Sequence, residues 1–224
     1  PINLRSITFA NDSNYYNSLD SLNSNLEKLV LGDNYTNKIY NLPFNLKILI
    51  LGKNYSYKIN FPFNLKYLDI GDSYTDALDN LPPNLETLII SGRFNNYINY
   101  PSRLKNLIFN ENSIFDNSIE FLPSTLEYFE IKNRYNLRIL DLPNSLRFLS
   151  LGDHYIGNII KFPENLEKLK LSENFNYEFP YLPESLKIIE LFDNHNYLKY
   201  LSSVYPNIKL DVKRKYLNDF FYNY

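Results

Sequence analysis

The sequence contains no cysteine, no methionine and no tryptophan among its 224 residues. Without cysteine, the chain has no disulfide framework, no thiolate nucleophile and no cysteine-based zinc site. Since there is no initiator methionine, we expect that the chain is processed or is part of something longer. Residues 1–4 have neither the basic nor the apolar region of a secretory signal peptide, so we expect a protein that is not secreted.

An excess of one charge and long apolar runs are also missing. The 23 basic and 25 acidic side chains give a formal net charge of −2. Nucleic-acid binding needs a net basic surface, so we expect no nucleic-acid partner. No stretch of about 18 apolar residues occurs, and we expect no membrane partner. With 44% hydrophobic residues, including 21 Tyr and 16 Phe, the chain can still bury a core.

A repeated unit organises the sequence. We call the first apolar residue after each Pro-x-Asn-like step the anchor, and anchors follow one another at intervals of 19 to 22 residues. The ten anchors are Leu4, Leu26, Leu46, Leu65, Leu85, Leu104, Leu126, Leu146, Leu166 and Leu186. Proline lies three residues before every anchor except Leu26, which has Asn23 there. No linker interrupts the repeats, so we expect one domain.

Each unit continues with the same apolar pattern. Apolar residues three and five positions after the anchor, such as Leu49 and Leu51 after Leu46, share one face of a short strand. An aromatic residue follows near the ninth position, such as Tyr55, and an apolar residue four positions later, such as Ile59. A unit of this length has no room for a full helix. The rest of each coil is therefore expected to be irregular or 3₁₀ structure, with proline at a corner.

These coils predict a leucine-rich-repeat-like solenoid with one short parallel strand per coil of 19–22 residues and an irregular or 3₁₀ convex side. One coil cannot bury its apolar residues alone, whereas stacking aligns them into a continuous core. We expect about ten coils over residues 1–203 and a C-terminal cap over 204–224 in the same domain. The cap should contain a last strand at Ile208–Val212 and a short amphipathic helix at Lys213–Tyr222. A basic and aromatic ligand patch is the alternative for this last segment.

The chain opens inside a repeat, and an uncapped solenoid end exposes its core edge. We therefore expect an upstream domain, or a partner, to cover the N-terminal end.

Short motifs within the units carry a family resemblance. Aromatic-Asn pairs occur at Phe94-Asn95, Tyr135-Asn136 and Phe175-Asn176. Proline corners occur at Pro123-Ser124-Thr125-Leu126, Pro143-Asn144-Ser145-Leu146 and Pro183-Glu184-Ser185-Leu186. In these features the units resemble FNIP repeats, a leucine-rich-repeat-like family of social amoebae and of giant viruses that infect amoebae. The abundance of Asn, Tyr, Ile, Lys and Phe is more similar to the giant-virus members.

The resemblance implies a non-enzymatic protein–protein interaction scaffold. Some relatives carry an F-box, which suggests the substrate-recognition region of an F-box-type ubiquitin-ligase receptor. It also implies an intracellular protein, in the host cytoplasm if the source is viral. Two other functions stay open: a structural or virion-associated rod that assembles through its solenoid ends, and a carbohydrate-binding repeat surface.

Strand residues at the second and fourth positions after each anchor should face outward on the concave sheet. Repeat geometry demands nothing of their chemistry, yet the middle of the stack is apolar and aromatic there, between polar ends. This pattern is typical of a protein interface. β-Branched and aromatic residues also suit a parallel sheet that has no partner. The predicted partner-binding residues are Ile48, Ile50, Tyr67, Asp69, Ile89, Ile108, Tyr128, Glu130 and Phe148.

Other candidate sites are weaker. One acidic residue per coil recurs seven positions after many anchors, which suits turn formation better than Ca²⁺ binding. The two histidines, His154 and His195, lie in similar turns without an evident nucleophile. Asn and Ser just before the anchors are expected to satisfy backbone groups at the corner. We therefore expect no catalytic site, no metal and no cofactor.

Overall fold

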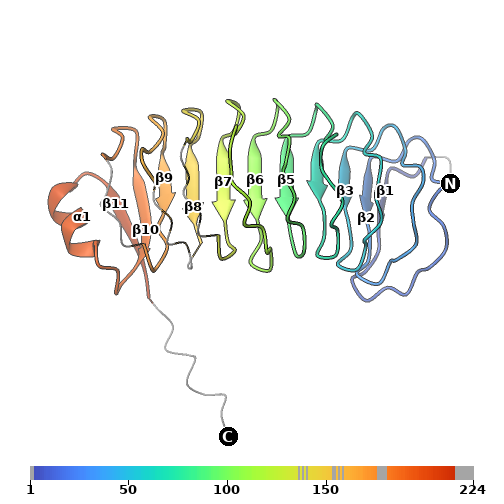
Figure 1. Cartoon of the computed structure of the whole chain (residues 1–224), viewed down its shortest axis with the longest axis horizontal. Coiled ribbons are helices and arrows are strands. Elements are labelled where there is room, and N and C mark those ends of the chain that lie inside the picture. Colours follow the sequence, from blue (N-terminus) through green and yellow to red (C-terminus); the bar gives the residue numbers. More distant parts are fainter. Residues whose placement is uncertain are drawn as a thin grey trace, which may run out of the picture.

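The computed structural model describes residues 3–135, 137, 139, 141–152, 155, 157, 159–175 and 181–214. In these residues, eleven parallel strands lie side by side in one sheet, in sequence order (Figure 1). The strands are β1 Ser6–Thr8, β2 Lys28–Val30, β3 Ile48–Ile50, β4 Tyr67–Asp69, β5 Thr87–Ile90, β6 Asn106–Phe109, β7 Tyr128–Ile131, β8 Phe148–Leu151, β9 Lys168–Lys170, β10 Ile188–Phe192 and β11 Lys209–Lys213. The predicted solenoid of about ten coils is therefore confirmed.

A proline corner leads into each strand from β3 to β10. The anchor N–H donates to the proline carbonyl three residues earlier, as from Leu46 to Pro43 at 3.1 Å. The side chain just before the anchor bonds the preceding coil, as Asn45 Nδ2 does to the Ser24 carbonyl at 2.8 Å. The corner is thus closed by one turn of 3₁₀ type, and its polar side chain satisfies a neighbouring backbone group as predicted.

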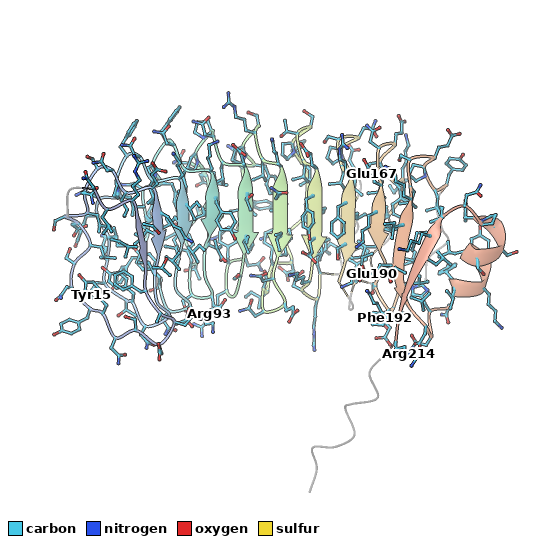
Figure 2. All side chains as sticks on the ribbon, turned by 180° about the vertical axis from the view of Figure 1, so that it is seen from behind. Tyr15, Arg93, Glu167, Glu190, Phe192 and Arg214 are labelled. Atoms are coloured by element: carbon cyan, nitrogen blue, oxygen red, sulfur yellow. The ribbon has the colours of Figure 1, made fainter. Side chains whose placement is uncertain are left out.

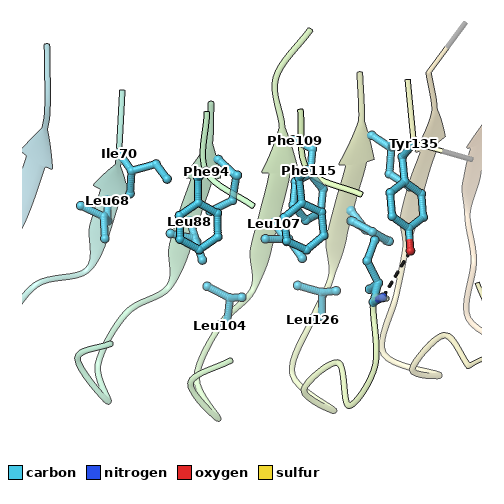
Figure 3. Packing of buried hydrophobic residues seen from close by; sticks show 14 of the residues in the cluster. Leu68, Ile70, Leu88, Phe94, Leu104, Leu107, Phe109, Phe115, Leu126 and Tyr135 are labelled. Atoms are coloured by element: carbon cyan, nitrogen blue, oxygen red, sulfur yellow. Dashed lines mark hydrogen bonds between the residues drawn. The ribbon is translucent and has the colours of Figure 1, made fainter. Parts of the chain in front are cut away.

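The alternating pattern of each strand places its leucines in the core. In the coil from Leu46, the side chains of Leu49, Leu51, Tyr55 and Ile59 are all buried, and most of the equivalent residues in the other described coils are buried as well. Figure 3 shows such residues of successive coils stacked as ladders. Burying one such side chain stabilises the fold by about 1.5–3 kcal/mol, so every added coil contributes to a shared core.

An aromatic ladder runs along the side of the core away from the sheet. Its rings stack with centroids 6.5 Å apart between Tyr35 and Tyr55 and 6.4 Å apart between Tyr135 and Tyr155. Their planes differ by 8° and 7°. Neighbouring strands lie only about 4.8 Å apart. The ring centroids are therefore farther apart than the strands, as expected for rings that stack with an offset.

Backbone N–H groups bond the buried tyrosine hydroxyls of this ladder. The Ile119 N–H donates to Tyr135 Oη at 3.2 Å (Figure 3), and the Ile39 N–H donates to Tyr55 Oη at 3.3 Å. Burial raises the pKa of Tyr55 and of Tyr135 to about 12. Each tyrosine thus joins its own coil to the preceding one, and burial keeps its hydroxyl protonated up to a higher pH than usual.

The C-terminal part contains an element that the sequence pattern did not predict. Helix α1, Leu198–Val204, lies between β10 and β11 and buries Leu201 at the end of the solenoid (Figure 1). Its N-cap residue Tyr197 makes no side-chain capping bond, so the usual start signal is missing. The strand expected near Ile208–Val212 is β11. The helix expected over Lys213–Tyr222 lies outside the described residues, apart from its first two.

Replacing Gly92 by alanine should destabilise the solenoid. Gly92 has φ +52°, and a Cβ there would lie 2.0 Å from the Asp72 carbonyl oxygen of the preceding coil. We expect the free energy of unfolding to fall by about 2–4 kcal/mol because both the backbone and the neighbouring coil must shift. Thermal denaturation followed by circular dichroism measures the change. The exposed Lys58→Ala is the control, and an unchanged melting temperature for Gly92→Ala would contradict the close approach.

Alkaline pH should unfold the protein through the tyrosine ladder. A pKa raised on folding stabilises the native state fully below the unfolded value near 10, and this stabilisation is lost as pH rises through the folded value. We expect unfolding free energy to fall between pH 10 and 12, by about 1.4 kcal/mol per pH unit for each such tyrosine. Denaturant melts of the natural chain and of Tyr55→Phe test this, since the variant should show the smaller slope. Equal slopes for the two proteins would contradict a contribution of Tyr55 to the alkaline loss of stability.

Candidate interaction surface

The nine residues predicted to bind a partner lie together on the outer face of β3 to β8. Strand register aligns them in two rows. The first row runs through Ile48, Tyr67, Tyr128 and Phe148, and the second through Ile50, Asp69, Ile89, Ile108 and Glu130. All nine are half-buried. We call these nine residues the face strip.

A polar pair interrupts the first row between its aromatic residues. Thr87 on β5 and Asn106 on β6 occupy the positions between Tyr67 and Tyr128, and Asn106 Nδ2 donates to Thr87 Oγ1 at 3.0 Å. These two side chains bond each other. A partner can therefore cover the face strip here without leaving this donor and this acceptor unpaired.

An aromatic pair at the C-terminal part of the face strip has fixed geometry. The rings of Tyr128 and Phe148 stack with centroids 4.3 Å apart and planes 10° apart. The Tyr128 hydroxyl donates to Glu130 Oε2 at 2.8 Å, and Lys168 Nζ lies 5.6 Å from the Phe148 centroid. Burial is the main cause that raises the pKa of Tyr128, with the Glu130 hydrogen bond second. The two rings form a flat apolar surface that is ordered before any partner binds.

A carboxylate lies among the apolar residues of the second row. Asp69 is flanked by Ile50 and Ile89, and its Oδ1 accepts the Gly71 N–H at 3.2 Å. No cationic side chain in the described part of the chain forms an ion pair with it. Burial raises its pKa, the Gly71 bond opposes this, and Asp72 adds to it. Asp69 is therefore a half-buried charge that a cation from outside would stabilise.

A second charged feature was not predicted from the sequence. It is a column of charged residues, one per coil, at the position just after each anchor. The signs largely alternate from coil to coil in the column Arg5, Glu27, Lys47, Lys66, Glu86, Lys105, Glu127, Arg147, Glu167 and Lys187. Glu167, near the start of β9 in Figure 2, pairs with Arg147 at 2.9 Å and with Lys187 at 2.8 Å. The Lys187 hydrogen bond is the main cause that lowers the pKa of Glu167. Reading this column across the repeats would have revealed the ladder.

His195 is a buried side chain that hydrogen-bonds to the backbone. Its Nδ1 accepts the Tyr197 N–H at 3.2 Å, and its Nε2 lies 3.0 Å from the Ser172 carbonyl. These bonds suit a neutral ring with its proton on Nε2, and burial lowers the pKa of His195. The other histidine, His154, lies outside the described residues.

The described ranges contain no group of three or more His, Cys, Asp or Glu side chains that could hold a metal ion. None of the helices found there combines the length and hydropathy that crossing a bilayer requires.

The fold and the exposed sheet define the class: a leucine-rich-repeat-like solenoid. The chain is similar to CroV588, described as a circular leucine-rich-repeat protein, with TM-score 0.54 and 23% identity over 84% of this chain and 40% of that chain. It is also similar to YopM from Yersinia enterocolitica WA-314, with TM-score 0.52 and 20% identity over 95% of this chain and 55% of that chain. The chain thus spans less than two thirds of either protein. At these identities the likeness shows the fold alone.

The sequence matches no protein-family model and no curated protein.

Asp69→Asn should stabilise the isolated protein at neutral pH. The folded pKa of Asp69 is raised, so its ionisation opposes folding above the unfolded pKa, whereas below that value both states are protonated. Asparagine can keep the Gly71 bond without the charge. Urea melts should therefore show a higher midpoint for Asp69→Asn at pH 7 and no difference near pH 3. The exposed Asp79→Asn removes the same charge as a control. A lower midpoint for Asp69→Asn at pH 7 would show that the carboxylate is already compensated.

Proposed function

We propose that this chain is a non-enzymatic scaffold that binds a protein partner through the face strip. The observation that carries the proposal is the chemistry of the strip across six neighbouring strands. Most equivalent positions elsewhere in the same sheet are polar, such as Ser6 and Thr8 on β1 and Lys168 and Lys170 on β9, whereas Val30 on β2 and Ile188 on β10 are apolar. The solenoid therefore does not need apolar side chains there. Their concentration on β3 to β8, with charged residues at its ends, is typical of a protein interface.

The order already present in the strip supports binding. The stacked Tyr128 and Phe148 rings lose little freedom when a partner covers them, and aromatic residues often dominate interface energies. Asp69 offers a charge among apolar neighbours, which would select a partner with a cation opposite it.

A finer proposal concerns the family and its biological setting. We propose that the coils are FNIP-type repeats of the giant-virus and social-amoeba kind, because the aromatic-Asn pair and the proline corner recur in phase. In that setting the face strip would hold substrates for an F-box-type ubiquitin-ligase receptor. Co-purification of the full-length natural protein with a cullin-ligase adaptor tests this finer assignment.

Simultaneous change of Tyr67, Ile89 and Tyr128 to serine should abolish partner binding without unfolding the solenoid. A photo-crosslinker placed at Ile108 first captures partners, which mass spectrometry identifies. Titration calorimetry with the purified partner then compares the natural chain with the triple variant. We expect at least a hundredfold weaker binding, since interface aromatic residues each contribute about 2 kcal/mol or more.

The matched control changes three exposed tyrosines off the sheet, Tyr40, Tyr97 and Tyr181, to serine. This variant should bind the partner normally. Undiminished binding by the face-strip variant would overturn the proposal, as would equal losses in both variants. Rods that grow with protein concentration would favour the structural alternative, and binding to a glycan array would favour the carbohydrate alternative.

A further inference from the structure

A small residue makes a hollow at the C-terminal end of the face strip. Ser150 on β8 continues the second row, and its neighbours in that row are the longer Glu130 on β7 and Lys170 on β9. Ser150 is only 1% exposed, and its Oγ has no hydrogen-bond partner in the described ranges. Buried hydroxyls nearly always form a hydrogen bond. An unbonded hydroxyl that lines a surface hollow therefore indicates a place where a group of a bound ligand completes the hydrogen bond.

The described side chains that line this hollow are charged, with one excess positive charge among them. Three cations and two carboxylates line it together with Ser150, Gly152 and Ile131: Lys132, Arg134, Lys170, Glu111 and Glu130. We call this set the Ser150 hollow.

Existing bonds occupy Glu130 and leave two of the cations without an ion pair. Glu130 accepts the Tyr128 hydroxyl at 2.8 Å and lies 3.7 Å from Lys132 Nζ. Within the part of the chain that the structure describes, Arg134 and Lys170 form no ion pair. Since no ion pair in the described ranges holds Lys170, its side chain can close on an incoming anion.

We propose that the Ser150 hollow receives a carboxylate side chain of the protein partner. The proposal rests on the function proposed above and names the chemistry of one partner group. The Ser150 hydroxyl would donate to the carboxylate, while Lys170 and Arg134 neutralise it. The single excess positive charge matches a monoanion better than the near-dianionic phosphate of a phosphorylated residue.

This site would give the interface a direction. Asp69 on β4 and Lys170 on β9 are five strands apart, which corresponds to about 24 Å along the sheet. A partner that crosses the strands would place a cation near Asp69 and its carboxylate in the Ser150 hollow. The stacked Tyr128 and Phe148 rings lie next to the hollow and would cover the apolar part of the same partner segment.

Titration of the ¹⁵N-labelled full chain with the capped tripeptide Gly-Glu-Gly tests the hollow directly. We expect saturable amide shifts at Ser150, Gly152 and Lys170 that weaken with added salt. The capped peptide Gly-Gln-Gly, which lacks only the charge, should give none. A phosphoserine peptide should bind more weakly than the glutamate peptide. Absent or non-saturable shifts, equal shifts with glutamine, or tighter phosphoserine binding would each overturn the proposal.

Two variants locate the binding. Lys170→Glu should weaken Gly-Glu-Gly at least tenfold, and Ser150→Ala should weaken it severalfold because the hydroxyl donor is lost. Lys28→Glu makes the same charge change on the same face, at β2, and should leave the affinity unchanged. Circular dichroism verifies that each variant is folded. Equal affinity for the natural chain and Lys170→Glu would contradict the assignment.

The experiment also separates the two proposals. If the peptide fails to bind while the triple face-strip variant loses its protein partner, the hollow is wrong and the interaction surface stands. If the peptide binds as expected but the triple variant still binds its partner normally, the anion site exists and the proposed surface is wrong.

Discussion

The parallel ladder between successive coils is the constraint on which the rest of this structure depends. Each strand bonds the next in register, so a buried residue must fit the equivalent residues above and below it. Leucine and isoleucine columns, and a column of Tyr and Phe rings, satisfy that requirement from coil to coil. Where two coils approach most closely, only glycine fits, as at Gly92.

The outer face of the sheet escapes this constraint, and there the residues depart from what stability alone would favour. The raised pKa of Asp69 shows that its carboxylate is held in an environment that opposes its charge. Ser150 has a buried hydroxyl without a bond in the described ranges. Departures of this kind are commonly found where a protein uses its surface. They lie on the same face of the sheet as the stacked rings of Tyr128 and Phe148.

Repetition made most of the fold predictable from the sequence. A single residue such as Leu49 says little, but its recurrence at fixed distance from ten anchors indicated both the strand and the buried side. Helix α1 could not be predicted this way because it occurs once, and its N-cap Tyr197 gives no capping signal. The positions of the face strip followed from alternation. The burial of Ser150 did not, because its neighbours in the row, Glu130 and Lys170, come from two other coils.

The structural repeat of this solenoid is one coil, but the charge column beside the anchors has a longer repeat. From Glu127 to Glu167 the sign returns after two coils, or 40 residues. Adding or removing two coils there would preserve the alternation, whereas a single coil would place like charges side by side. Lys47 and Lys66 already form such a like-charged step, and each pairs with a carboxylate on its far side, Glu27 or Glu86. At that step the alternation of charge shifts by one coil.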